Sequence, residues 1–172
     1  SLVSIILYNL YQQKKAEKLQ SAFENAAASF RLTLTEQNIV GKLAIGFDKT
    51  RKKLLFLAMD GSRKTLHFVN LREIKSCMVV KTYALLKRSR VSLNEIIQTV
   101  GLQFNYHDAG KTLVLPFYNK ETDATNEMMA RAEFAEYWQK LLSGSLSKYN
   151  GEFAARPKAF PSHKFFYDAS LK

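Results

Sequence analysis

The chain has 172 residues, of which 47% are apolar and 24% are charged. This length corresponds to one domain with extensions, and the apolar fraction excludes a chain that is disordered throughout. The 26 basic and 15 acidic residues give a net charge of +11. Twelve basic and three acidic residues lie between Asp48 and Arg90. This excess predicts either a surface for an anionic partner or a solubilising surface.

The first segment, Leu2 to Tyr11, is almost wholly apolar and is followed by lysines. It is too short to cross a bilayer, which needs about 20 residues. We interpret it as the end of a membrane anchor that begins before Ser1, or as a helix packed on the body or on a second copy. In an anchor, the lysines place the rest of the chain on the cytoplasmic side. Because residues 1–31 contain no Gly or Pro, we expect one helix over residues 1–30, about 45 Å long.

From Phe30 onward the apolar residues recur at every second position, which predicts β-strands. Strands are expected at residues 32–35, 40–47, 52–59, 63–69, 74–83, about 99–106 and 111–118. Asp60-Gly61 is a strong hairpin signal, and the short connections make consecutive strands antiparallel neighbours. Pro116 cannot donate to a sheet, so we expect it at an edge or a bulge. Residues 93–97 fit either a short helix or a strand.

The stretch from Thr122 to Leu142 predicts an amphipathic helix that carries the only tryptophan, Trp138. Thr122 or Asp123 is expected to cap its start, and Gly144 lies just past its expected end. Such a helix after a set of strands is typical of a plug on a curled antiparallel sheet. The predicted organisation is therefore a helix over 1–30, a domain over 31–142 and an aromatic, basic tail over 143–172.

This order of elements resembles the pleckstrin-homology superfold, in which antiparallel strands form two near-orthogonal sheets and a final helix closes the open end. Residues 39–142 carry the resemblance, and the segments GKLAIGFDKTRKKLLFL and KTLVLPFY are similar to bacterial membrane-linked proteins with such a domain. It implies an α+β fold with six or seven strands in a barrel or two orthogonal sheets. It also implies basic residues at the first hairpin, where we place Lys49, Arg51, Lys52 and Lys53.

The sequence contains no pattern that is typical of catalysis. The histidines are far apart, and no nucleophile elbow, P-loop or dinucleotide fingerprint occurs. The single cysteine, Cys77, excludes an intrachain disulfide and a cysteine zinc cluster, and its apolar neighbours predict a buried thiol. We therefore expect no enzyme, cofactor or metal site. The strand aromatics Phe47, Phe56, Phe68 and Phe104 are expected in the core.

The favoured hypothesis is a non-enzymatic interaction module, cytoplasmic or on the cytoplasmic side of a membrane. It would bind an acidic protein or an anionic membrane surface through basic hairpins. The residues predicted for this contact are Lys49, Arg51, Lys52, Lys53, Arg63 and Lys64. The alternatives are a domain that binds the nucleic-acid backbone by charge and a homo-oligomeric scaffold that associates through the N-terminal helix.

Overall fold

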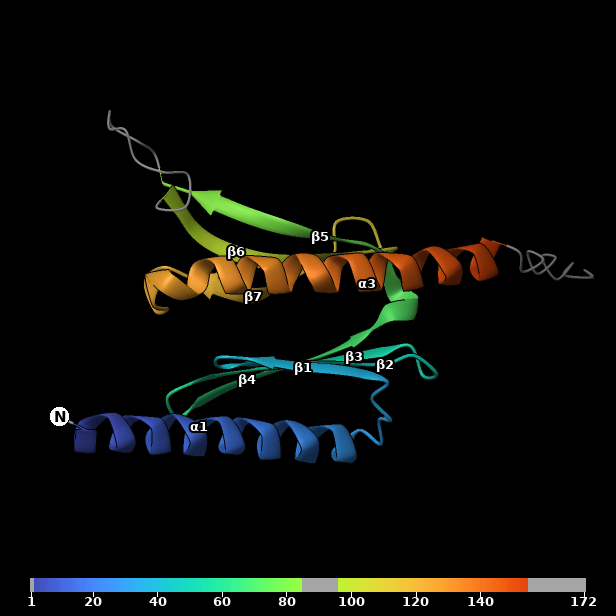
Figure 1. The fold of residues 1–172 in the computed structure, drawn as a ribbon. Helices are drawn as coiled ribbons and strands as arrows, with labels where there is room; N and C mark the ends of the chain where they lie inside the picture. Colours follow the sequence, from blue (N-terminus) through green and yellow to red (C-terminus); the bar gives the residue numbers. More distant parts are fainter. Residues whose placement is uncertain (1, 85–95, 155–172) are drawn as a thin grey trace, which may run out of the picture.

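The computed structural model describes residues 2–84 and 96–154, which form two antiparallel sheets and two long helices (Figure 1). The predicted α+β class, the two helices at the ends of the order and a number of strands within the predicted six or seven are confirmed, whereas the bounds of the first strands differ. Of the two predicted arrangements, a barrel or two orthogonal sheets, the described residues form two separate sheets and not a closed barrel. The strands are divided into a four-stranded sheet of order β1-β2-β3-β4 and a three-stranded sheet of order β5-β6-β7, and no described ladder joins the two sheets.

The elements follow one another with short connections. Their bounds are α1 Leu2–Ser29, β1 Glu36–Val40, β2 Leu43–Asp48, β3 Lys53–Asp60, β4 Arg63–Asn70, the 3₁₀ turn η1 Leu71–Glu73, β5 Ile74–Tyr83, β6 Ile97–Tyr106, β7 Thr112–Asn119, the 3₁₀ turn η2 Thr125–Glu127 and α3 Met128–Ala154. The expected strand over 74–83 is confirmed at both ends. Residues 85–95, which include most of the segment left open between helix and strand, lie outside the described residues.

The start of the first sheet differs from its prediction. The segment 40–47 is not one strand, because Gly41 adopts a φ of +54° and the chain turns between β1 and β2. Residues 32–35 are not a strand, although they alternate. Leu32 and Leu34 pack on the cluster between α1 and the sheet, so their period reflects packing of a connecting segment. The hairpin that carries Lys49 is therefore the second of this sheet rather than the first.

The main core lies between the two sheets and α3. Along β2 and β3, alternate residues such as Ile45 and Phe56 point into this core. Trp138 of α3 is fully buried in it, as expected for a helix that closes the space between the sheets. Cys77 is buried there as well, and the core positions predicted for Phe47, Phe56 and Phe104 are confirmed.

The other face of the four-stranded sheet packs against α1, so α1 and α3 lie on opposite sides of this sheet (Figure 1). Phe23 of α1 is buried against the sheet, and an added Cβ at Gly46 would lie 2.9 Å from its ring and 2.7 Å from Leu34. A glycine at this position thus permits the close approach of the helix. The core position predicted for Phe68 is wrong: its side chain lies on this face, 40% exposed, at the edge strand β4.

The three-stranded sheet and the last helix complete the body. Pro116 lies in the edge strand β7 beside a register shift opposite Val100 and Gly101, so both predicted positions for this proline are confirmed. Helix α3 begins at Met128, later than predicted, and it continues through Gly144 to Ala154. Leu146 repeats the buried position of Leu142 one turn later, and this packing extends the helix into the predicted tail.

Candidate functional site

Four of the six predicted site residues lie together at the turn between β2 and β3. This turn is held by Asp48, whose buried carboxylate accepts two backbone N–H groups. Its Oδ1 accepts from the N–H of Arg51 at 2.8 Å, and its Oδ2 accepts from the N–H of Thr33 at 2.9 Å. Lys52 adopts a φ of +58°, and its carbonyl accepts from the N–H of Leu71 at 2.9 Å. Asp48 therefore joins the end of α1 to this turn.

Two further arginines belong to this end of the sheet and were not predicted from the sequence. Arg31 lies two residues after the end of α1, has a φ of +53° and precedes the Asp48 contact of Thr33 by two residues. Arg72 follows the Leu71 contact in η1. We call Arg31, Lys49, Arg51, Lys52, Lys53 and Arg72 the turn cluster. The sequence carries no local signal for this group, because three segments far apart in the chain contribute to it.

An exposed pair of aromatic rings adjoins the turn cluster. Phe30 and Phe68 are stacked with their ring centroids 4.6 Å apart and their planes 18° apart. The Nζ atom of Lys53 lies 5.4 Å from the Phe68 ring centroid, in cation–π contact. Each phenylalanine is 40% exposed. The pair therefore presents aromatic surface beside the Lys53 ammonium group, and Phe30 directly precedes Arg31 in the chain.

The other two predicted residues, Arg63 and Lys64, lie at the opposite end of the sheet. Antiparallel pairing sets Asp60 against Arg63 and Lys53 against Asn70, so β3 separates the two turns. Its seven steps of about 3.3 Å place them about 23 Å apart. The Debye length at physiological salt is about 8 Å. The six predicted residues therefore form two separate basic groups rather than one site.

The N-terminal third of α1 extends past the end that carries Arg63. The large apolar side chains from Val3 to Tyr11 are between 48% and 65% exposed. Ile5, Ile6, Leu7 and Tyr8 are consecutive and all exposed, and successive helical residues are rotated by about 100°. The helix is therefore apolar around its whole circumference here. We call residues 3–11 the apolar end of α1. Neither long helix in the described ranges has a stretch apolar and long enough to cross a bilayer.

A groove of about 960 Å³ lies between α1 and the body next to the apolar end of α1. Tyr11 and Lys15 line one wall of it, and the opposite wall contains ion pairs. There, Lys42 Nζ lies 2.5 Å from an oxygen of Asp123 and 3.7 Å from one of Asp60. These pairs connect the two turns at this end of the sheet to the segment before α3.

Buried Arg131 lines the floor of this groove. Its guanidinium donates to Glu127 at 2.8 Å and to the carbonyl of Phe117 at 3.3 Å. Lys42 is thus paired with Asp123 and Asp60, and Arg131 is paired with Glu127. These pairs indicate a structural role for the floor and the opposite wall of the groove.

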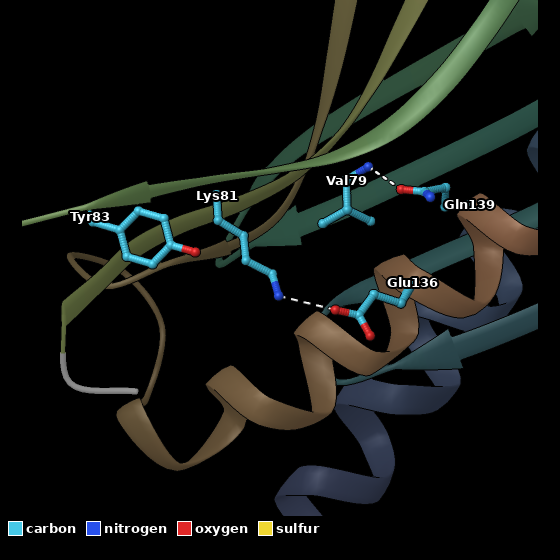
Figure 2. A pocket seen from close by; sticks show the side chains of 5 residues that line it. All are labelled: Val79, Lys81, Tyr83, Glu136 and Gln139. Carbon is cyan, nitrogen blue, oxygen red and sulfur yellow. Dashed lines mark hydrogen bonds and ion pairs between the residues drawn. The ribbon is translucent and has the colours of Figure 1, made fainter. Parts of the chain in front are cut away.

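A smaller cleft lies between β5 and α3, and Figure 2 shows its lining. The Nζ of Lys81 lies 3.0 Å from Oε1 of Glu136, and the backbone N–H of Val79 donates to the side-chain carbonyl of Gln139 (Figure 2). The helix thereby covers part of the edge of β5, which would otherwise present unpaired backbone groups. These contacts assign the cleft to the packing of α3 on the sheet.

The described residues provide few groups for chemistry. No three His, Cys, Asp or Glu side chains in the described ranges are placed to hold a metal ion. Burial raises the pKa of the Cys77 thiol, which disfavours the nucleophilic thiolate. Burial lowers the pKa of His67, whose ring lies 6.2 Å from that of Phe56. Comparison of the chain with protein-family models, with curated proteins and with solved structures finds no match.

Proposed function

We propose that the protein is a non-enzymatic interaction module that is held at a membrane by the apolar end of α1. We also propose that its body is a divergent relative of the pleckstrin-homology superfold, supported by sheets of four and three antiparallel strands followed by a helix. The observation that carries the membrane function is the exposure of apolar side chains around the whole circumference of one helical end.

A partner helix or domain covers one stripe of a helix, whereas a bilayer covers all sides of it. A helix that is apolar all round is typical of a protein interior or a membrane. Seven large side chains are exposed between Val3 and Tyr11, and their transfer out of water is worth on the order of 10 kcal/mol. The segment is about 15 Å long, which is about half the apolar thickness of a bilayer.

The residues around the apolar end of α1 support the same orientation. Tyr8 and Tyr11 lie at its inner limit, and Lys14, Lys15 and Lys18 follow within the next two turns. Tyrosines and lysines in this order are typical of the boundary between lipid and the cytoplasm. We therefore place the body on the cytoplasmic side of the membrane.

The position of the hairpins limits which basic residues contribute to lipid binding. The turn between β3 and β4 lines the same groove as Tyr11, so Arg63 and Lys64 lie beside the bilayer in this orientation. The turn between β2 and β3 is about 23 Å further away, close to three Debye lengths. Anionic lipid contact is therefore proposed for Arg63 and Lys64 with the α1 lysines, and not for the turn cluster.

Co-sedimentation of the full chain with vesicles tests the proposal. We expect binding to phosphatidylcholine vesicles that contain anionic phosphatidylglycerol, and loss of binding in an Ile6→Asp/Leu10→Asp variant, whose exposed sites leave the fold unchanged. Gln37→Glu/Thr50→Glu, at two exposed positions outside α1 and the β3–β4 turn, is the matched control for two added negative charges.

A second pair of variants tests the orientation. Arg63→Glu/Lys64→Glu should weaken binding to anionic vesicles on the order of 30-fold, because each basic residue near such a surface contributes about 1 kcal/mol. Lys49→Glu/Arg51→Glu should leave vesicle binding unchanged. Failure of the unaltered chain to bind these vesicles would refute the membrane function. A concentration-dependent mass without lipid, lost in Ile6→Asp/Leu10→Asp, would show instead that α1 joins copies of the chain.

A further inference from the structure

The turn cluster contains six basic side chains and surrounds one buried carboxylate, that of Asp48. Asp48 is buried and accepts two backbone N–H groups at 2.8 and 2.9 Å. Arg31, Arg51 and Arg72 are exposed around it. Guanidinium groups match the oxygens of phosphates and carboxylates with paired hydrogen bonds. This end of the sheet therefore attracts an anionic chain, and it faces away from the bilayer in the orientation proposed above.

The aromatic pair selects among anionic partners. Phe30 and Phe68 are stacked 4.6 Å apart and each is 40% exposed, with Lys53 in contact with the Phe68 ring. Proteins that bind single-stranded nucleic acids combine cations along the backbone with aromatic rings on which bases stack, since every base has a π-face. A protein partner more often anchors a side chain in a pocket, and both grooves described above are lined by other residues.

From this arrangement we propose that the turn cluster and the Phe30–Phe68 pair form a binding site for a single-stranded nucleic acid. Phosphates lie on Arg31, Arg51 and Lys53, and a base packs on the exposed surface of the aromatic pair. The site is independent of the membrane function, because the two basic groups are about 23 Å apart on β3. Recognition is by charge and stacking, so sequence preference is weak.

Fluorescence anisotropy with a labelled oligothymidylate of about 20 nucleotides, longer than a typical site, tests this proposal on the full chain. We expect saturable binding at about 50 mM salt. If three or four phosphates are neutralised, the affinity should fall about 20- to 50-fold between 50 and 200 mM salt. Absence of binding at the lower salt concentration would overturn the proposal.

Two kinds of variant separate the charge from the stacking. Arg31→Glu/Arg51→Glu should weaken binding and flatten its salt dependence. Phe68→Leu keeps an apolar side chain at a half-exposed position, and it should weaken binding about 5-fold or more with the salt dependence unchanged. Phe30→Leu is the second variant for the same effect, in case Phe68→Leu alters the edge strand. Circular dichroism and urea unfolding check that each variant is folded.

The matched control is Arg63→Glu/Lys64→Glu, which removes the same charge from the other end of the sheet. It should retain most of the binding to the oligonucleotide. An equal loss in this control would show that the net charge attracts the oligonucleotide without a site. Equal displacement by polyglutamate, together with no effect of Phe68→Leu and Phe30→Leu, would show a site for acidic polypeptides and would also overturn the proposal.

Discussion

Replacement of Asp48 should have the largest effect on stability of any single charged residue in the four-stranded sheet. Its carboxylate is buried and accepts from the N–H groups of Arg51 and Thr33. An alanine leaves both N–H groups without their acceptor at a place that water does not reach. An asparagine keeps one acceptor oxygen and turns an NH₂ donor toward the second N–H group.

The magnitude follows from the type of hydrogen bond. A bond to a charged group contributes about 1.5–3 kcal/mol to stability, so loss of both should cost about 3–6 kcal/mol in Asp48→Ala. Asp48→Asn should cost roughly half as much, about 1.5–3 kcal/mol. Asp60→Ala is the matched control at the opposite turn. That carboxylate is 64% exposed and lies 3.7 Å from Lys42, and an exposed ion pair contributes about 0–1 kcal/mol.

Urea unfolding followed by the fluorescence of Trp138 measures these differences, because this indole is fully buried in the folded state. The urea concentration at the unfolding midpoint should be highest for Asp60→Ala, lower for Asp48→Asn and lowest for Asp48→Ala. The dependence of the unfolding free energy on urea concentration should be the same in all three variants. A loss below about 1 kcal/mol in Asp48→Ala, or an equal loss in Asp60→Ala, would refute the view that Asp48 holds the turn cluster together.

Three further predictions concern the body of the protein. Gly46→Ala should lower the free energy of unfolding by about 1–3 kcal/mol in the same assay, because the new methyl group would lie 2.7 Å from Leu34; an unchanged midpoint would contradict the tight contact with α1. Because burial lowers the pKa of His67, the unfolded state binds the proton more tightly than the folded state. The free energy of unfolding should therefore be highest above pH 6.5 and decrease as the pH falls from 6.5 to the lowered pKa. Urea unfolding at a series of pH values should show that His67→Gln removes this decrease. Cys77 is buried with a raised pKa, so its thiol should react slowly with a disulfide reagent until urea unfolds the chain, and fast reaction in the folded state would contradict its burial.

Much of the architecture could be predicted from the sequence because single residue patterns specify it. The β-branched and apolar residues of 74–83 indicated β5, and the imino ring of Pro116 restricted it to an edge or a bulge. Boundaries set by tertiary packing could not be found in this way. Gly144 normally favours the end of a helix, yet Leu146 packs into the core and α3 continues.

The candidate sites were predictable only in part. Lys49 and Arg63 are both basic hairpin residues in the sequence, and only the register of β3 with β4 shows that they lie at opposite ends of the sheet. Phe68 alternates like a core residue, but α1 covers the neighbouring strands and leaves it half open. Arg31 joins the turn cluster through a contact between segments that are far apart in the chain.

Helix α1 runs without interruption from its apolar end to Ser29, and Thr33, four residues later, contacts Asp48. An α-helix is stiff and rises by about 1.5 Å per residue, so the distance from Tyr11 to Phe30 is about 28 Å. If the first turns of α1 are embedded in lipid, the length of the helix sets the distance of the stacked Phe30 and Phe68 rings from the headgroups. A ligand held there would stand clear of the membrane surface by a fixed gap, and shortening the helix by whole turns would lower it in steps of about 5.4 Å.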